Sequence, residues 1–174
     1  MTYFYNTIPS AGIDFATAYT ISTSTPEYPG SPIELGTTIL GTDGSRWTLC
    51  KLEAASTCTA GDALIVTTNS TWEVKALTNT LGVSKLGQLV GIAGATGTAG
   101  QYVWMQVSGY NGTVNAVTGS AAFTALHSSA TGGRLTSTAA AATSVAINGI
   151  VILATAASNV AAAVLTNPVV GAND

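Results

Sequence analysis

Charged residues are missing from almost the whole second half of this chain. No Asp, Glu, Lys or Arg occurs between Lys85 and Arg134, and none occurs again between Arg134 and Asp174. Over all 174 residues, charged side chains make up only 7%, against about 25% in an ordinary soluble domain. Half of the chain must therefore be solvated by Thr, Ser, Asn, Gln and Gly, or be covered by another molecule.

Two interpretations of this composition differ in what lies on the surface. The first is a neutral, hydroxyl-rich β surface in contact with water. The second, which we favour, is that identical neighbours cover much of it, because charge is depleted at the centres of protein interfaces. The net charge of −3 leaves no basic patch for phosphates, so no nucleic-acid partner is expected.

No export signal, membrane span or cysteine site is expected. Residues 1–10 contain no Lys or Arg and no apolar run, unlike a secretory signal. The longest apolar stretch, residues 147–165, is interrupted by polar residues and falls short of the ~20 apolar residues of a membrane span. Cys50 and Cys58 lack neighbouring His or Asp, so they predict buried thiols in a protein made in the cytoplasm, not a zinc site or a disulfide framework.

The first 35 residues differ in composition from the rest. They hold four of the five prolines and no sustained helical pattern, so they predict an extended N-terminal arm ahead of a β domain of residues 36–174. The apolar side chains of the arm need a surface, either the chain's own domain or another protein. We expect contact with a neighbouring molecule, because the β segments supply enough apolar residues for a core. The candidate contact residues are Tyr3, Phe4, Tyr5, Ile8, Ile13, Phe15 and Tyr19.

After Gly36, short apolar runs alternate with turn signals. The expected strands are residues 46–52, 63–67, 72–76, 88–93, 102–107, 125–128, 134–137, 147–154 and 160–165. Asp43-Gly44 and Asn111-Gly112 are typical of hairpin turns. Short strands at this spacing predict a single, mainly β domain, a small barrel or sandwich of antiparallel strands. Residues 121–127 and 139–142 are alternatives for short helical turns, because they are rich in Ala.

The sequence contains no catalytic constellation. His127 is the only histidine and has no carboxylate nearby in sequence to orient it, so it is a weak candidate for a base. The Gly-rich residues 91–100 lack the Lys-Ser/Thr ending of a phosphate-binding loop. Trp47, Trp72 and Trp104 alternate with apolar neighbours, which indicates core or subunit contacts rather than a carbohydrate platform. We therefore expect no enzyme, no cofactor and no metal site.

The small-residue pattern of the chain is similar to that of a known structural family. The motifs are residues 35–38 (LGTT), 41–45 (GTDGS), 47–51 (WTLCK), 59–63 (TAGDA), 90–93 (VGIA) and 99–109 (AGQYVWMQVSG), with 132–135 (GGRL), 149–150 (GI) and 167–168 (NP) in the same style. In these motifs the chain resembles the decoration, or cement, proteins of tailed-bacteriophage capsids. The likeness is one of pattern, not of a catalytic signature, and it does not extend to the arm.

This resemblance implies a function and a set of partners. It implies a β-rich virion protein that is made in the host cytoplasm and stabilises a phage head by binding its outer surface. The implied partners are the major capsid protein and further copies of the chain, most simply in a trimer, with no nucleic acid and no membrane. The competing class is a phage or cell-surface binding module, such as an adhesin or fibre domain that grips host glycans.

Overall fold

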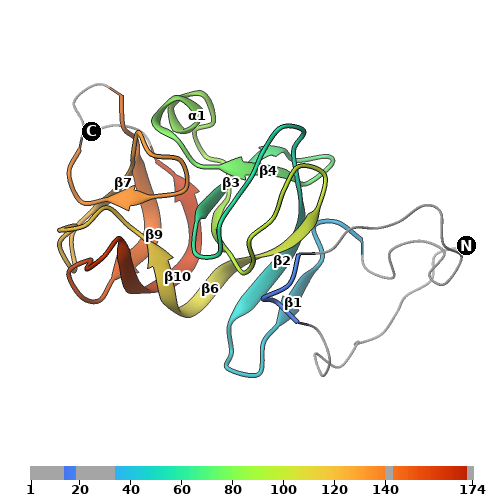
Figure 1. The fold of residues 1–174 in the computed structure, drawn as a ribbon, viewed down its shortest axis with the longest axis horizontal. Helices are drawn as coiled ribbons and strands as arrows, with labels where there is room; N and C mark the ends of the chain where they lie inside the picture. Colours follow the sequence, from blue (N-terminus) through green and yellow to red (C-terminus); the bar gives the residue numbers. More distant parts are fainter. Residues whose placement is uncertain (1–13, 19–33, 140–142, 172–174) are drawn as a thin grey trace, which may run out of the picture.

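The structure is a computed structural model that describes residues 14–18, 34–139 and 143–171. It is mainly β, with 47% strand and 4% helix, which confirms the predicted fold class. The elements are β1 (Thr38–Leu40), β2 (Arg46–Leu52), β3 (Ala63–Thr68), β4 (Glu73–Ala76), α1 (Asn79–Ser84), β5 (Val90–Ala93), β6 (Tyr102–Asn115), β7 (Leu126–Ser128), β8 (Leu135–Thr136), β9 (Ala146–Ile152) and β10 (Val160–Val170) (Figure 1). The arm predicted for residues 1–35 falls largely outside the described residues, so its boundary stays a prediction.

Five of the strands pair in a closed ring. β2 pairs with β6, β6 with β5, β5 with β3 and β3 with β4, each time antiparallel. A parallel pairing of β4 with β2, with Leu52 opposite Val74, completes the circuit. That parallel step departs from the antiparallel strands expected from the sequence. Closing the ring leaves none of these five strands as a free sheet edge over its paired residues.

The second half of β6 leaves the ring and forms a second sheet region with the C-terminal strands. There β6 pairs with β10, β10 with β9, β9 with β7, and β7 with β8, all antiparallel. Figure 1 shows β6 running from the ring toward β9 and β10. The turn predicted at Asn111-Gly112 is wrong, because β6 continues to Asn115. Asn111 lies opposite Ala163 of β10, and its Nδ2 donates to Gln106 Oε1 at 2.7 Å, so its polar side chain is satisfied within the strand.

Strands β3 and β5 separate two apolar cores. One core takes buried side chains from all five ring strands, including Leu64 and Val66 of β3. The other core joins β3 and β5 to the C-terminal strands, and it contains Ala63 and Ile65 of β3. Successive residues of a strand point to opposite faces, so a strand between two cores must be apolar on both. This explains why the sequence shows an unbroken apolar run here rather than an alternation.

The helical predictions are not confirmed. The one helix among the described residues is α1, which begins after Thr78, whose Oγ1 accepts from the Leu81 amide at 3.3 Å. The suggested helical turn at residues 121–127 is wrong, because turn and bend geometry leads there directly into β7. Of the other suggested segment, residues 140–142 lie outside the described part of the chain.

Candidate docking surfaces

The described residues hold no group of three or more His, Cys, Asp or Glu side chains that could bind a metal ion. His127 is half-buried in β7, opposite Thr136 of β8. Asp62 is nearly buried and accepts from the Thr59 amide at 2.7 Å and from Asn115 Nδ2 at 2.8 Å, so it ties a turn to β6. These contacts give Asp62 a structural explanation and suggest no reaction.

The two cysteines are free and buried, as expected. Burial raises the pKa of the Cys50 thiol to about 12 and that of the Cys58 thiol to about 11. The thiolate is the nucleophilic form of cysteine, and both side chains stay protonated near neutral pH. Their chemistry is therefore that of small apolar core residues.

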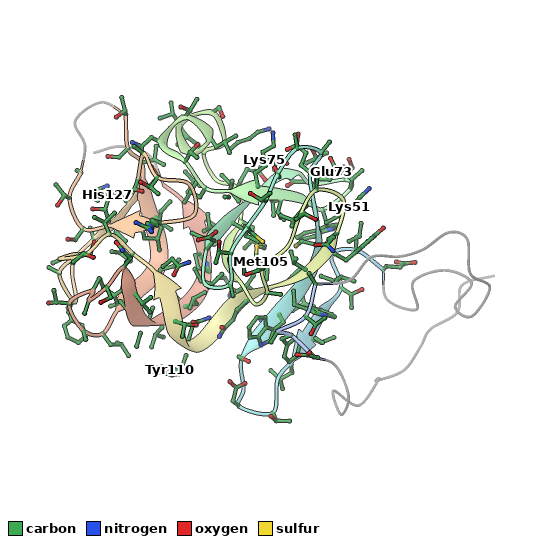
Figure 2. All side chains as sticks on the ribbon, viewed as in Figure 1. Lys51, Glu73, Lys75, Met105, Tyr110 and His127 are labelled. Carbon is green, nitrogen blue, oxygen red and sulfur yellow. The ribbon has the colours of Figure 1, made fainter. Side chains whose placement is uncertain are left out.

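The charges are distributed unequally over the molecule. Lys51, Glu73 and Lys75 lie on the ring strands β2 and β4, and Lys75 Nζ forms an ion pair with Glu53 at 3.1 Å. Figure 2 shows these three labelled side chains in the upper part of the view, from the middle toward the right, with His127 on the left. In residues 86–139 and 143–171, which include β5, all of β6 and β7 to β10, Arg134 is the only charged residue. The uncharged half is where an interface is expected.

An exposed apolar row crosses three strands of that uncharged half. Val164 of β10 lies opposite both Tyr110 of β6 and Val151 of β9, so the three side chains point to the same side of the sheet. Their exposed fractions are 37%, 59% and 42%. Val160 and Leu153 continue the row on β10 and after β9. We call the surface made by Tyr110, Val151, Leu153, Val160 and Val164 the outer face; Figure 2 shows Tyr110 directed away from the ribbon.

A shallow depression lies along β9. It has a volume of about 330 Å³ and is lined by residues 123–126 and 146–151. Phe123 is 73% exposed on its rim, and its amide donates to the Ile152 carbonyl at 3.0 Å. The backbone of Phe123 has a positive φ of 54°, a conformation that few L residues adopt. An exposed aromatic ring on an unusual backbone conformation beside a depression is suited to contact with another molecule.

Residues 14–18, which we call the strap, lie against the chain's own ring. The Phe15 ring stacks on Trp47 with a centroid distance of 4.7 Å and meets Trp104 edge-on at 5.6 Å. A Cβ at Gly94 would lie 2.3 Å from the Phe15 carbonyl oxygen, so only glycine allows this approach. Phe15 thus packs on an aromatic face within the same chain, that of the half-exposed Trp47. The expected contact of the arm with a neighbouring molecule stays a prediction.

The other predicted contact residues were Tyr3, Phe4, Tyr5, Ile8, Ile13 and Tyr19, and all of them lie outside the described residues. Their role stays a prediction. Of the three tryptophans, Trp104 is buried while Trp47 and Trp72 are half-buried, in agreement with core positions rather than an exposed platform. The sequence analysis placed an interface in the charge-poor part of the chain but did not identify the residues of the outer face, because both sides of these strands are apolar in sequence. The signal available in the sequence for this surface was the absence of charged residues at the solvent-facing positions of β9 and β10.

No helix in the described part of the chain is long and apolar enough to cross a membrane. A scan against protein-family models and a search of curated proteins found no match to this sequence.

Proposed function

We propose that this protein is a structural capsid decoration protein, which binds the outer surface of a phage head as a homo-oligomer and stabilises the shell. The observation that carries the proposal is the uncharged half with its exposed apolar outer face. Such a surface is costly to leave in water but suits dense packing of many copies. The motifs that resemble capsid decoration proteins, at residues 36–109, support the same function.

The arm supplies the contact with the major capsid protein in this proposal. Residues 1–13 contain no charged side chain and carry Tyr3, Phe4, Tyr5, Ile8 and Ile13. The strap that follows them is fixed to the ring through Phe15, so the segment starts from a defined point on the domain. An uncharged, aromatic segment can bury its rings on the shell and add its backbone to a sheet edge there.

One observation favours the alternative of a host-binding module. Phe123 projects beside the depression that Thr124 and Asn148 also line. An exposed aromatic ring next to polar side chains is a common way to hold a sugar. In that case glycan binding would depend on Phe123 and would be independent of the arm.

Co-sedimentation with purified, undecorated capsids of the phage that encodes the chain tests the proposal. We expect the full chain to sediment with capsids and a variant lacking residues 2–13 to bind at least about tenfold more weakly, since several buried aromatic contacts are lost. The deletion stops before the strap, so that Phe15 stays on Trp47. Circular dichroism checks that the shortened variant keeps its β structure.

Phe123→Ala is the matched control, because it removes an exposed aromatic ring outside the arm. It should leave capsid binding unchanged. A full chain that does not bind capsids, together with glycan binding that Phe123→Ala abolishes, would replace the proposal with the host-binding module.

A further inference from the structure

We infer that the outer face binds the outer face of a second copy of this chain. The inference names the surface for the self-association in the proposed function, on which it rests, but its test requires no capsid. The face is formed by β6, β10 and β9, which lie side by side through continuous antiparallel pairing. Sheets pack face to face about 10 Å apart when their facing side chains interdigitate.

The size of the exposed surface is the first argument. The outer face is a contiguous apolar patch of five exposed side chains on neighbouring strands, and patches of this kind are often functional. A standard interface covers about 800 Å² on each partner. Thr113, Thr166 and Asn148 are exposed around the row and can supply the polar rim. The outer face would therefore form the apolar centre of an interface, and these polar side chains would complete it at the rim.

The lack of charge on the outer face limits the kind of partner that can bind it. Arg134 is the only charged residue in residues 86–139 and 143–171. A partner with charged groups at its contact surface would lose their hydration and find no opposite charge here. The partner surface must be as neutral as this one, and a second copy of the same half satisfies this condition without like-charge repulsion.

The pattern of side-chain sizes fits two copies of the same surface. Along β10, the outward side chains run Val160, Ala162, Val164, which is large, small, large. On β6 the outward Tyr110 is followed by Gly112, where an added Cβ would meet nothing closer than Tyr110 Oη at 3.7 Å. Each strand thus presents projecting side chains beside shallow hollows. Two such faces, shifted by about two residues, can place the projections of one in the hollows of the other.

Sedimentation equilibrium of the full chain at micromolar concentration tests the inference. The wild type should give a mass of at least twice 17.4 kDa, because a contact between two identical faces pairs the chains. Val164→Asp places a charge at the centre of the row and should raise the dissociation constant roughly a hundredfold or more. Gly112→Val fills a hollow and should also weaken assembly, by about tenfold or more.

Val83→Asp is the matched control, since Val83 is 49% exposed on α1, outside the outer face. It should leave the mass unchanged. If circular dichroism shows that the Val164→Asp variant does not fold, the result for Gly112→Val alone tests the inference. A monomeric wild type, or an oligomer that Gly112→Val leaves intact, overturns the inference. An intact, face-dependent oligomer that does not bind capsids would instead contradict only the proposed function.

Discussion

At the scale of single residues, Phe15 connects the strap to the domain. Its ring contacts Trp47 and Trp104 at 4.7 and 5.6 Å between centroids. We expect Phe15→Ala to lower the free energy of unfolding by about 1–2 kcal/mol, because a half-buried aromatic ring and two ring pairs are lost. Urea unfolding followed by tryptophan fluorescence measures this loss.

Phe123→Ala supplies the comparison for Phe15→Ala. Phe123 is 73% exposed, so its removal should change the unfolding free energy by no more than about 0.5 kcal/mol. Equal effects of the two substitutions would mean that Phe15 does not pack on Trp47 and Trp104 in solution.

The buried thiols make stability depend on alkaline pH. Their pKa values rise from 9.0 to about 12 for Cys50 and about 11 for Cys58. Between pH 9 and 11 the unfolded chain loses thiol protons that the folded chain keeps, so the unfolding free energy must fall as pH rises. We expect the urea midpoint to decrease over this range, and to decrease less in the Cys50→Ala/Cys58→Ala double variant, which removes both titrating groups.

All other ionisable groups are common to both proteins, so the difference between the two pH profiles isolates the thiols. Parallel profiles for the wild type and the double variant would show that the thiols are not buried as described.

At the scale of elements, β6 takes part in both regions of the sheet, and Gly109 lies where its pairing passes from β2 to β10. Gly109 has a φ of 98°, and a Cβ there would lie 2.8 Å from the Cα of the buried Ser45. We expect Gly109→Ala to cost about 2 kcal/mol or more, because it adds a strained backbone conformation to a clash with backbone. Thermal unfolding should show this as a fall in Tm of several degrees.

Gly132→Ala controls for the loss of a glycine. Its added Cβ would meet only ordinary contacts, at 3.6 Å from Thr78 and 3.8 Å from Ala76. Its Tm should stay close to that of the wild type. A Gly109→Ala variant as stable as Gly132→Ala would contradict the positive φ of Gly109 and its close approach to Ser45.

The sequence predicted those elements whose local pattern agrees with their tertiary surroundings. Residues 46–52 alternate and are bounded by a turn signal, and β2 has these limits. Local signals failed where long-range pairing decides the outcome: β6 extends through Asn111-Gly112 because β10 runs beside it. The parallel pairing of β4 with β2 joins segments separated by β3, and no local pattern reports such a pairing.

The candidate surfaces were predictable only in part. The missing charges indicated that an interface lies in the second half, but residues on opposite sides of β10 are both apolar. Pairing geometry was needed to assign Val164 to the outside and Leu165 to the core. The Phe15–Trp47 stack joins residues 32 positions apart in sequence, and neither residue has a local signal that names the other.

At the scale of the whole molecule, strands β3 and β5 contribute side chains to both cores, and this should make unfolding cooperative. β3 contributes Leu64 to the ring core and Ile65 to the second core. Loss of the second core would expose one face of β3 and β5 to water while the ring stayed closed. Exposing fully buried Ile65, Val90 and Ile92 would cost several kcal/mol. A half-unfolded state is therefore unfavourable.

Ile152→Ala tests this coupling from a distance. Ile152 is fully buried in the second core on β9, whereas Trp47, Trp72 and Trp104 all belong to the ring half of the sequence. The substitution should cost about 2–5 kcal/mol through the cavity it leaves. If β3 and β5 couple the two cores, the unfolding transitions followed by tryptophan fluorescence and by far-ultraviolet circular dichroism should both shift to the same lower urea midpoint. A fluorescence midpoint that stays in place while circular dichroism becomes biphasic would mean that the ring unfolds on its own, since the tryptophans would then report a core that Ile152 does not support.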